Sequence, residues 1–161
     1  MNRPLSTSAR RVQEAIEKRG FDFIVLELSE STRTAQDAAA AIGCDVGQIV
    51  KSLIFREEDS DEPILALVSG NNRVDPEKLS AVGAGQLAKA DAGFARRHSG
   101  FAIGGIPPCG HETPIRTFID EDLLRFDTVW AAAGTPNAVF ELDPAALPPL
   151  TSGVICDMKT D

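Results

Sequence analysis

Two short apolar runs separated by an acidic stretch constrain the fold of this chain more than any other feature. The first run, residues 49–55, is rich in β-branched and aromatic residues and contains one lysine, while the second, residues 64–68, is apolar throughout. Such runs are typical of strands, and a continuous apolar run is typical of a strand buried on both faces. The acidic segment 56–62 between them predicts a hairpin loop. A β-hairpin is therefore expected near the middle of the chain.

The remaining signals alternate between short helices and short strands. Helices are predicted at 8–19 and 34–42, from Asp45, from Asp75, from Asp91 to about His98, and at the Asp-Pro pair 143–144. Further strands are predicted at 23–28, 101–103, 115–119, 128–132, 138–142 and 153–156. About seven strands and five or six helices without regular β-α-β alternation predict a mixed α/β or α+β fold with a curved or barrel-like sheet. No repeat or linker divides the sequence, so one domain over residues 1–161 is expected.

Composition and charge exclude several classes of protein. Of the 161 residues, 43% are hydrophobic, which suffices for a globular core. With 16 basic and 24 acidic residues the formal net charge is −8, which opposes sequence-independent binding to long nucleic acid, so no DNA partner is expected. No apolar segment is long enough to span a membrane, and three widely spaced cysteines indicate reduced thiols. We expect a cytoplasmic protein with no membrane partner.

Motifs for nucleotide, redox and zinc chemistry are absent from the sequence. It has no Walker loop, no GxGxxG segment after a strand, no HExxH pair and no paired-cysteine metal site. No cofactor and no metal are therefore expected, and any nucleophile is expected to come from water or from the substrate.

Lys51 is the residue of the central hairpin that suggests chemistry. A lysine inside an apolar strand must either extend to the edge of the sheet or direct its ammonium into a concavity that holds an anion or a carbonyl group. The alternative is an edge lysine that discourages aggregation. Ser52 is expected on the opposite face of the strand, so the two side chains cannot form an adjacent catalytic pair.

The segment 100–111 is the densest irregular stretch of the sequence. Its paired glycines allow the backbone to approach a ligand closely, and its two prolines stiffen the residues that follow. This pattern predicts a rigid cradle of backbone N–H donors for an oxyanion, a carbonyl or a water molecule, although a structural corner is the alternative. The residues predicted to form the cradle are Gly104, Gly105, Ile106, Pro107 and Pro108.

Two reactive side chains follow the glycines and prolines of this segment. Cys109 and His111 stand two residues apart, which suggests a thiolate nucleophile beside a base. Because catalytic pairs usually meet through the fold, the favoured interpretation is an unreactive thiol and a loop or surface histidine. A thiol-dependent acyl hydrolase stays open as one hypothesis.

Two other segments carry weaker signals. Arg96 and Arg97 belong to the local basic cluster of an acidic chain, and they are either cations at a helix end or contacts to RNA. The small residues at 131–137 follow a predicted strand and suggest a tight pocket wall.

Several of these segments together resemble a known family. They are VKSLIF at 50–55, SGNNRVD at 69–75, SGFAIGGIPP at 99–108, IDE at 119–121 and AGTP at 133–136. In this order and spacing the chain, from its first helix to about Leu150, is similar to the YbaK family, also called the prolyl-tRNA synthetase-associated or aminoacyl-tRNA deacylase editing domain.

The resemblance implies a free-standing hydrolase that removes a wrongly attached amino acid from tRNA after release by the synthetase. The family's lysine falls on Lys51, where it is expected to position the terminal adenosine or the aminoacyl group. Its Gly-x-x-x-Pro loop falls on 104–108, whose backbone is expected to orient the ester and the attacking water, with help from a ribose hydroxyl. The implied partners are the acceptor end of an aminoacyl-tRNA and, transiently, a prolyl-tRNA synthetase.

The segment 131–134 departs from part of the family. Cys-tRNA deacylases tend to carry a serine there and the synthetase-inserted domains use a histidine, whereas this chain has alanines. The departure implies the subgroup that acts on tRNA(Pro) carrying alanine or another small amino acid, selected by pocket size. The residues expected to bind the substrate are Asn71, Ala132, Ala133, Gly134 and Asn137. A non-catalytic module that binds the tRNA acceptor end or a synthetase is the second hypothesis.

Overall fold

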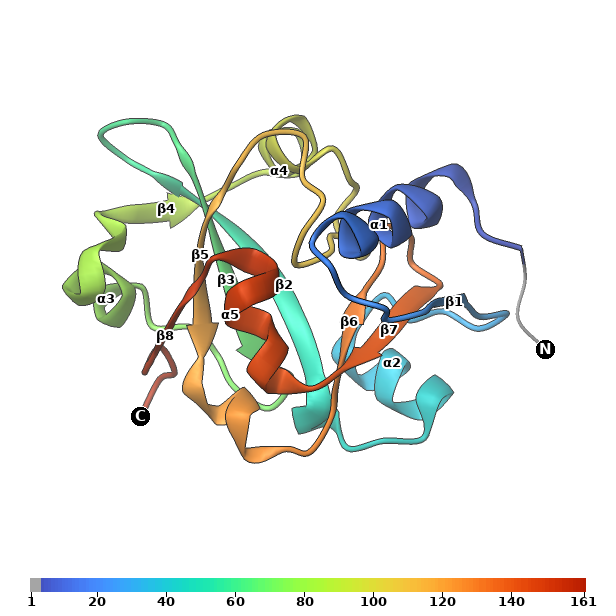
Figure 1. Ribbon diagram of the computed structural model, residues 1–161. Coiled ribbons are helices and arrows are strands. Elements are labelled where there is room, and N and C mark those ends of the chain that lie inside the picture. The colour runs from blue at the N-terminus through green and yellow to red at the C-terminus, as the bar shows by residue number, and fades with distance from the viewer. Residues whose placement is uncertain (1–3) are drawn as a thin grey trace.

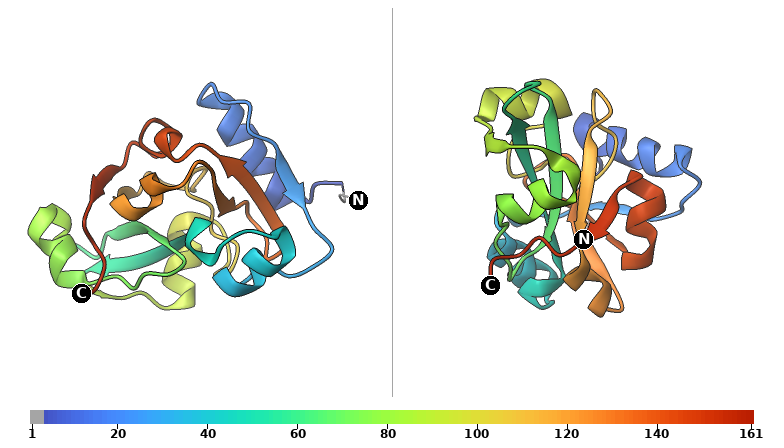
Figure 2. Two further views of the ribbon diagram at one scale, coloured as in Figure 1. Left: turned by 90° about the horizontal axis from the view of Figure 1, so that it is seen from below. Right: turned by 90° about the vertical axis from the view of Figure 1, so that its left-hand side faces the viewer.

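Eight strands form one mixed sheet in the computed structural model, which describes residues 4–161 (Figure 1). The strands are β1 (Val25–Glu27), β2 (Ile49–Glu57), β3 (Pro63–Ser69), β4 (Leu87–Lys89), β5 (Arg116–Asp120), β6 (Val129–Ala132), β7 (Ala138–Leu142) and β8 (Val154–Cys156). Their order is β1-β7-β6-β2-β3-β5-β8, and β4 pairs with the end of β2. The sheet is strongly curved (Figure 2), so the predicted curved mixed sheet is confirmed.

Short helices cover the two faces of this sheet. They are α1 (Thr7–Lys18), α2 (Ala35–Ile42), α3 (Pro76–Leu79), α4 (Ala92–Ser99) and α5 (Leu147–Thr151), with 3-10 segments at Val46–Gln48, Glu121–Arg125 and Pro144–Ala146 and a π-helical segment at Ser80–Ala84. Three starts follow the predicted aspartates, since the side chains of Asp75, Asp91 and Asp143 each accept a bond from a backbone N–H of the first turn. Thr34, predicted as the first residue of its helix, caps α2 in the same way.

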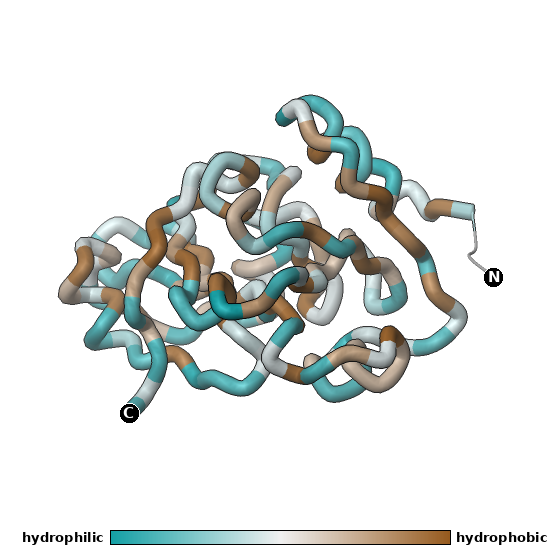
Figure 3. The backbone as a smooth tube through the Cα atoms, turned by 60° about the horizontal axis from the view of Figure 1, so that its bottom comes forward, coloured by the Kyte–Doolittle hydropathy of each residue, from teal (hydrophilic) through white to brown (hydrophobic). Residues whose placement is uncertain are grey.

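Strand β3 is buried on both faces, as its uninterrupted apolar run predicts. Leu65 and Leu67 pack into the main core beneath α1 and α5, whereas Ile64, Ala66 and Val68 pack into a second core with α3. Hydrophilic and hydrophobic stretches are interspersed along the rest of the chain (Figure 3). Within residues 4–161 no helix is long and apolar enough to cross a membrane.

Two local predictions about strands were wrong. Residues 101–103 form a turn and not a strand, because Gly100 ends α4 in the left-handed conformation (φ +84°) and the Ser99 hydroxyl binds the Phe101 backbone. The apolar Phe101 suggested a strand, but its side chain packs in the core from a turn, where it is 1% exposed. Strand β4 was not predicted, since its three residues form a strand only by pairing with the end of β2.

The two edges of β2 are paired differently. On one edge β3 pairs with it continuously from Val50 to Arg56. On the other edge β6 pairs only with Ile49 and Val50, and β4 only with residues 55–57. Within the described chain no strand occupies this edge at residues 51–54. The sheet therefore has an interruption beside the strand that carries Lys51, and other segments can approach the strand there.

Candidate functional site

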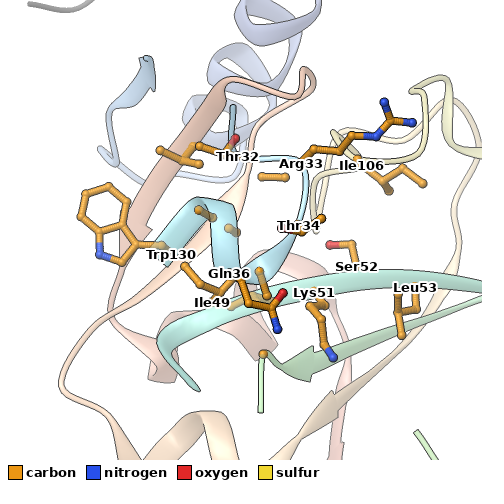
Figure 4. Close-up of a pocket in the computed structure, with 18 of the residues that line it drawn as sticks. Thr32, Arg33, Thr34, Gln36, Ile49, Lys51, Ser52, Leu53, Ile106 and Trp130 are labelled. Atoms are coloured by element: carbon orange, nitrogen blue, oxygen red, sulfur yellow. The ribbon is translucent and has the colours of Figure 1, made fainter. Parts of the chain in front are cut away.

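A cavity of about 420 Å³ lies at the interrupted edge of β2 (Figure 4). Most of its walls come from β2, the end of β6, the first turn of α2 with the residues before it, and the loop after α4. The volume falls within the range of about 300–1,000 Å³ that is common for small-molecule sites. Four segments distant in sequence thus meet around one strand edge.

Lys51 and Ser52 line this cavity from opposite faces of β2, as predicted (Figure 4). Lys51 is half-buried, and its Nζ donates a 2.7 Å hydrogen bond to the backbone carbonyl of Asn72. The Ser52 hydroxyl lies on the side of Thr34 and Ile106 and has no hydrogen-bond partner within residues 4–161 although its oxygen is buried. Ser52 is therefore a free polar group inside the cavity, a role that the sequence did not reveal.

The ammonium of Lys51 lies among groups of both charges. Burial is the main cause that lowers its pKa from the ordinary value, the nearby Arg73 guanidinium lowers it further, and Asp120 acts in the opposite direction. A cation that is partly removed from water interacts more strongly with an incoming anion or carbonyl oxygen than an exposed lysine does. The ammonium has three N–H donors, so Lys51 is placed to bind such a group while one donor stays on Asn72.

The five residues predicted as a backbone cradle divide into two groups. Gly104 and Ile106 line the cavity, and their N–H groups have no partner within residues 4–161. Gly105 is turned away, because its carbonyl accepts from Gly134 N at 2.8 Å. Pro107 and Pro108 are buried outside the cavity lining. Two amides of the loop therefore belong to lining residues and are not used by other groups of the described chain.

Gly104 is a position where only glycine fits without strain. Its φ is +96°, and a Cβ there would lie 2.8 Å from the Cγ of Arg33. The side chain of Arg33 crosses this glycine and is itself exposed at the cavity. The close approach holds the loop and the α2 segment together across the mouth of the cavity.

The predicted pocket wall is also divided between lining and support. Ala132 lines the cavity, whereas Ala133, Gly134 and Asn137 do not. Gly134 binds the glycine loop as described above, the Ala133 amide donates to Ala138 O at 2.9 Å, and Asn137 Nδ2 donates to Glu30 O at 3.0 Å. The turn at 133–137 thus fastens the loop after α4 to the segment before α2.

Three other predicted residues lie outside the cavity lining. Asn71 is exposed and packs over Gly47, where an added Cβ would meet its Nδ2 at 2.7 Å. Arg96 and Arg97 are exposed at the end of α4, and the guanidinium of Arg97 lies 5.6 Å from the ring centre of Phe94. The structure therefore does not bring these three residues together with Lys51 at the cavity.

Sequence reasoning missed the wall formed by residues 32–38 and Trp130. Arg33, Thr34 and Gln36 present polar groups there, while Trp130 and Ile49 form an apolar end on the other side (Figure 4). The available signal was the polar run STRT directly before a predicted helix, since a helix start offers unpaired backbone N–H groups and attracts anions.

Cys109 and His111 belong to a different cavity of about 360 Å³. Burial raises the pKa of the Cys109 thiol to about 11, so it is protonated near neutral pH. His111 Nε2 lies 2.7 Å from the Pro107 carbonyl, and burial lowers its pKa, so the neutral ring donates to that carbonyl. These residues do not form an activated thiolate pair. The sequence predicted His111 as a loop or surface histidine. In the structure it lies half-buried in a loop, which its bond to Pro107 supports.

The aminoacyl-tRNA editing domain family matches residues 29–149 of this chain, a span that contains the whole lining of the cavity. The chain belongs to this family. YwhH of Bacillus subtilis (strain 168), an uncharacterized protein, is 32% identical over 123 residues, which are 76% of this chain and 78% of YwhH. The match confirms the family resemblance that the sequence motifs predict.

The chain is also similar to one solved structure and to part of a synthetase. The editing domain is 50% identical to the crystal structure of a candidate trans-editing enzyme for prolyl-tRNA synthetase, with a TM-score of 0.91 over 98% of this chain and 100% of the other. It is 27% identical over 94 residues to the proline–tRNA ligase of Limosilactobacillus fermentum (strain NBRC 3956 / LMG 18251), covering 56% of this chain but 16% of the ligase. Only a small part of that ligase therefore resembles this chain.

Proposed function

We propose that this editing domain is a deacylase that hydrolyses the ester of tRNA(Pro) carrying alanine or another small amino acid, acting apart from the synthetase. The observation that carries this proposal is the cavity at the interrupted edge of β2. Its lining includes the half-buried ammonium of Lys51, the unpaired hydroxyl of Ser52 and the two loop residues with unpaired amides, and within residues 4–161 no cysteine lines it. Those groups suit the binding of an RNA end and an ester whose attacking group is water.

The two faces of β2 suggest a division of labour in this reaction. We assign the ester carbonyl to the part of the cavity lined by Gly104, Ile106 and Ser52, where N–H donors would stabilise the oxyanion that forms when water attacks. Lys51 lies on the other face, and we assign it to the terminal nucleotide of the tRNA. Water adds to the carbonyl carbon, the bond from carbon to ribose oxygen breaks, and that oxygen leaves with a proton.

The dimensions of the cavity bear on which amino acid is removed. At about 420 Å³ it is too large as a whole to exclude proline by total volume. We assign the selection to local shape at the apolar end, around Ile49 and Trp130. A narrow apolar end would reject a larger ring by steric clash, where attraction alone distinguishes a methylene by only about 1–3 kcal/mol.

A deacylation panel tests the proposed function. Wild-type protein and the Lys51→Ala and Cys109→Ala variants are incubated with tRNA(Pro) charged with alanine, proline, serine or cysteine, and release of the amino acid is measured. We expect the wild type to release alanine fastest, Lys51→Ala to lose about 100-fold in kcat/KM, and Cys109→Ala to stay within about twofold.

Each arm of the panel has an outcome that contradicts the proposal. Equal rates for Lys51→Ala and wild type would remove the assigned role of the lysine, and loss of activity in Cys109→Ala would restore the thiol mechanism. Saturable binding of aminoacyl-tRNA without turnover would favour a non-catalytic module. Circular dichroism and thermal unfolding confirm that each variant is folded.

A further inference from the structure

The residue that binds the Lys51 ammonium is itself held by two carboxylates. Lys51 Nζ donates to the carbonyl of Asn72 at 2.7 Å. The side chain of the same asparagine donates from Nδ2 to Asp120 Oδ2 at 2.8 Å and to Asp122 Oδ2 at 2.9 Å. The position of the carbonyl that receives the ammonium therefore depends on an amide that bridges two acidic side chains.

Asp120 is the centre of this arrangement and is 0% exposed. Its Oδ2 also accepts from Ser69 N at 3.0 Å, and its Oδ1 accepts from Asp122 N at 2.9 Å. All three donors come from N–H groups, and none comes from a charged side chain. An asparagine could not replace the carboxylate without turning an NH2 group toward one of these donors. A fully buried carboxylate without an ion-pair partner within residues 4–161 is unusual and costly, so its presence here calls for a specific use.

The other side of the turn at residues 70–75 is held by the C-terminal segment. Lys159 Nζ donates to Asp122 Oδ2 at 2.7 Å. Asp75 N donates to Met158 O at 2.7 Å, and Thr160 N donates to Arg73 O at 2.9 Å. With Asp120 on one side and this segment on the other, the turn has little freedom to move relative to β2.

We propose that Asp120 is a positioning residue for Lys51, and that it acts through the side chain of Asn72 to hold the ammonium at the rim of the cavity. The proposal rests on the proposed function, because Lys51 is assigned there to the terminal nucleotide. Asp120 itself lies outside the cavity lining, so it does not touch the substrate.

The charges near Lys51 give this role a second effect. Asp120 and Arg73 are the charged groups that act on the ammonium directly, and they oppose each other, the carboxylate raising the pKa of Lys51 and the guanidinium lowering it. The next charged groups, Lys159 and Arg125, are paired with Asp122. Loss of the Asp120 charge is therefore expected to lower the pKa of Lys51, and loss of the Arg73 charge is expected to raise it.

The test compares Asp120→Asn with Arg73→Gln in two independent measurements. The first is the titration of the Lys51 signal in NMR spectra of protein labelled with 13C-lysine, identified by its absence in Lys51→Arg. The second is deacylation, with kcat and KM determined separately. We expect the pKa of Lys51 to fall in Asp120→Asn and to rise in Arg73→Gln. For Asp120→Asn we also expect kcat to fall about tenfold or more, because a displaced group of the site reacts poorly.

Two further variants keep the test decisive. Asp143→Asn is the matched control, since that carboxylate caps another 3-10 segment and makes no hydrogen bond to Lys51, Asn72 or Asp120, and its Lys51 titration and kinetics should equal those of the wild type. If Asp120→Asn does not fold, Asn72→Ala takes its place, because it removes both bonds to the carboxylates and leaves the carbonyl; its Lys51 signal should move toward that of an exposed lysine, with a similar loss in kcat.

The outcomes separate this proposal from the proposed function. An unchanged Lys51 titration and an unchanged kcat in a folded Asp120→Asn, or in Asn72→Ala, would overturn the positioning role. If the wild type proves to have no deacylase activity, the proposed function fails, and the NMR titration alone still decides whether Asp120 governs Lys51.

Discussion

Two cavities lie on either side of the loop after α4, and they differ in what their polar groups are free to do. In the first, Lys51, Ser52, Gly104 and Ile106 line a space at the edge of the sheet, and the Ser52 hydroxyl and the two loop amides have no hydrogen-bond partner within residues 4–161. In the second, Cys109 and His111 carry the side chains that a sequence search for hydrolases would favour. There the thiol is protonated and the imidazole is bound to the Pro107 carbonyl.

The difference shows that environment outweighs residue type. A cysteine is a good nucleophile only as a thiolate, and burial without a neighbouring cation that outweighs it keeps the proton on sulphur. Ser52, Gly104 and Ile106 carry no obvious catalytic signal in the sequence, but at an interrupted strand edge they supply donors that no other group within residues 4–161 uses. The loop after α4 contributes to both cavities. His111 of the second cavity binds the Pro107 carbonyl of this loop, and Gly104 and Ile106 of the same loop line the first cavity.

The largest effect that separates the two cavities is expected at Gly104. Replacing it with alanine forces an L-residue to φ +96° and places a methyl group against Arg33 at the cavity. We expect Gly104→Ala to reduce kcat/KM about 30-fold, because a displacement of the loop amides weakens oxyanion binding. Steady-state deacylation measures the loss.

Gly20→Ala is the matched control for that substitution. Gly20 has a φ of +86°, similar to Gly104, but open space around its absent Cβ. It should cost about 1 kcal/mol in the free energy of unfolding and leave kcat/KM unchanged. If Gly104→Ala behaves in the same way, the loop has no role in the reaction.

A smaller effect is expected from the arginines. Arg33→Gln removes a cation at the cavity that has no ion-pair partner within residues 4–161, so KM should rise about fivefold and the dependence of kcat/KM on salt should weaken. The double variant Arg96→Gln/Arg97→Gln tests the RNA contact predicted from the sequence, and we expect a smaller rise in KM because these residues lie off the cavity. A larger rise in KM for the double variant than for Arg33→Gln would show that the RNA contacts α4 and not the Arg33 side of the cavity.

The smallest effect concerns stability and belongs to the second cavity. His111→Gln should lower the free energy of unfolding by about 1 kcal/mol at pH 7.5, because the bond to Pro107 is altered. Burial lowers the pKa of His111 in the folded state, so the unfolded chain binds more protons, and wild-type stability falls as pH drops from about 6.5 through the folded pKa.

Glutamine cannot titrate, so the variant should lose this part of the pH dependence. Urea unfolding at pH 7.5 and pH 5.5 measures it in both proteins. Identical slopes with pH for wild type and variant would show that His111 is not held neutral by its surroundings.

The central hairpin and the helix starts could be predicted because they depend on neighbours in the chain. Alternation along a strand placed Lys51 and Ser52 on opposite faces, and aspartates before helices proved to be caps. The same local reasoning failed at Phe101, whose apolar character reflects burial in a turn, and at β4, which exists only through pairing with β2.

The make-up of the candidate site was less predictable. The sequence pointed to Asn71, but Asn72 is the residue whose carbonyl binds Lys51 and whose side chain reaches Asp120. One position along a turn decides which side chain faces inward, and no periodic pattern fixes that choice. Arg33 and Thr34 were missed because nothing in their own segment indicates that it will lie opposite the loop after α4.

The amino-acid sequence by itself determined most of the strands, the aspartate caps, the buried hairpin and the family motifs, since these follow from side-chain periodicity and from short-range backbone geometry. Only the tertiary structure decided where β6 and β4 leave the edge of β2, and hence where a cavity opens and which amides and hydroxyl stay unpaired. That outcome depends on contacts between segments as far apart as residues 33 and 104, whose geometry is set by the packing of the whole sheet.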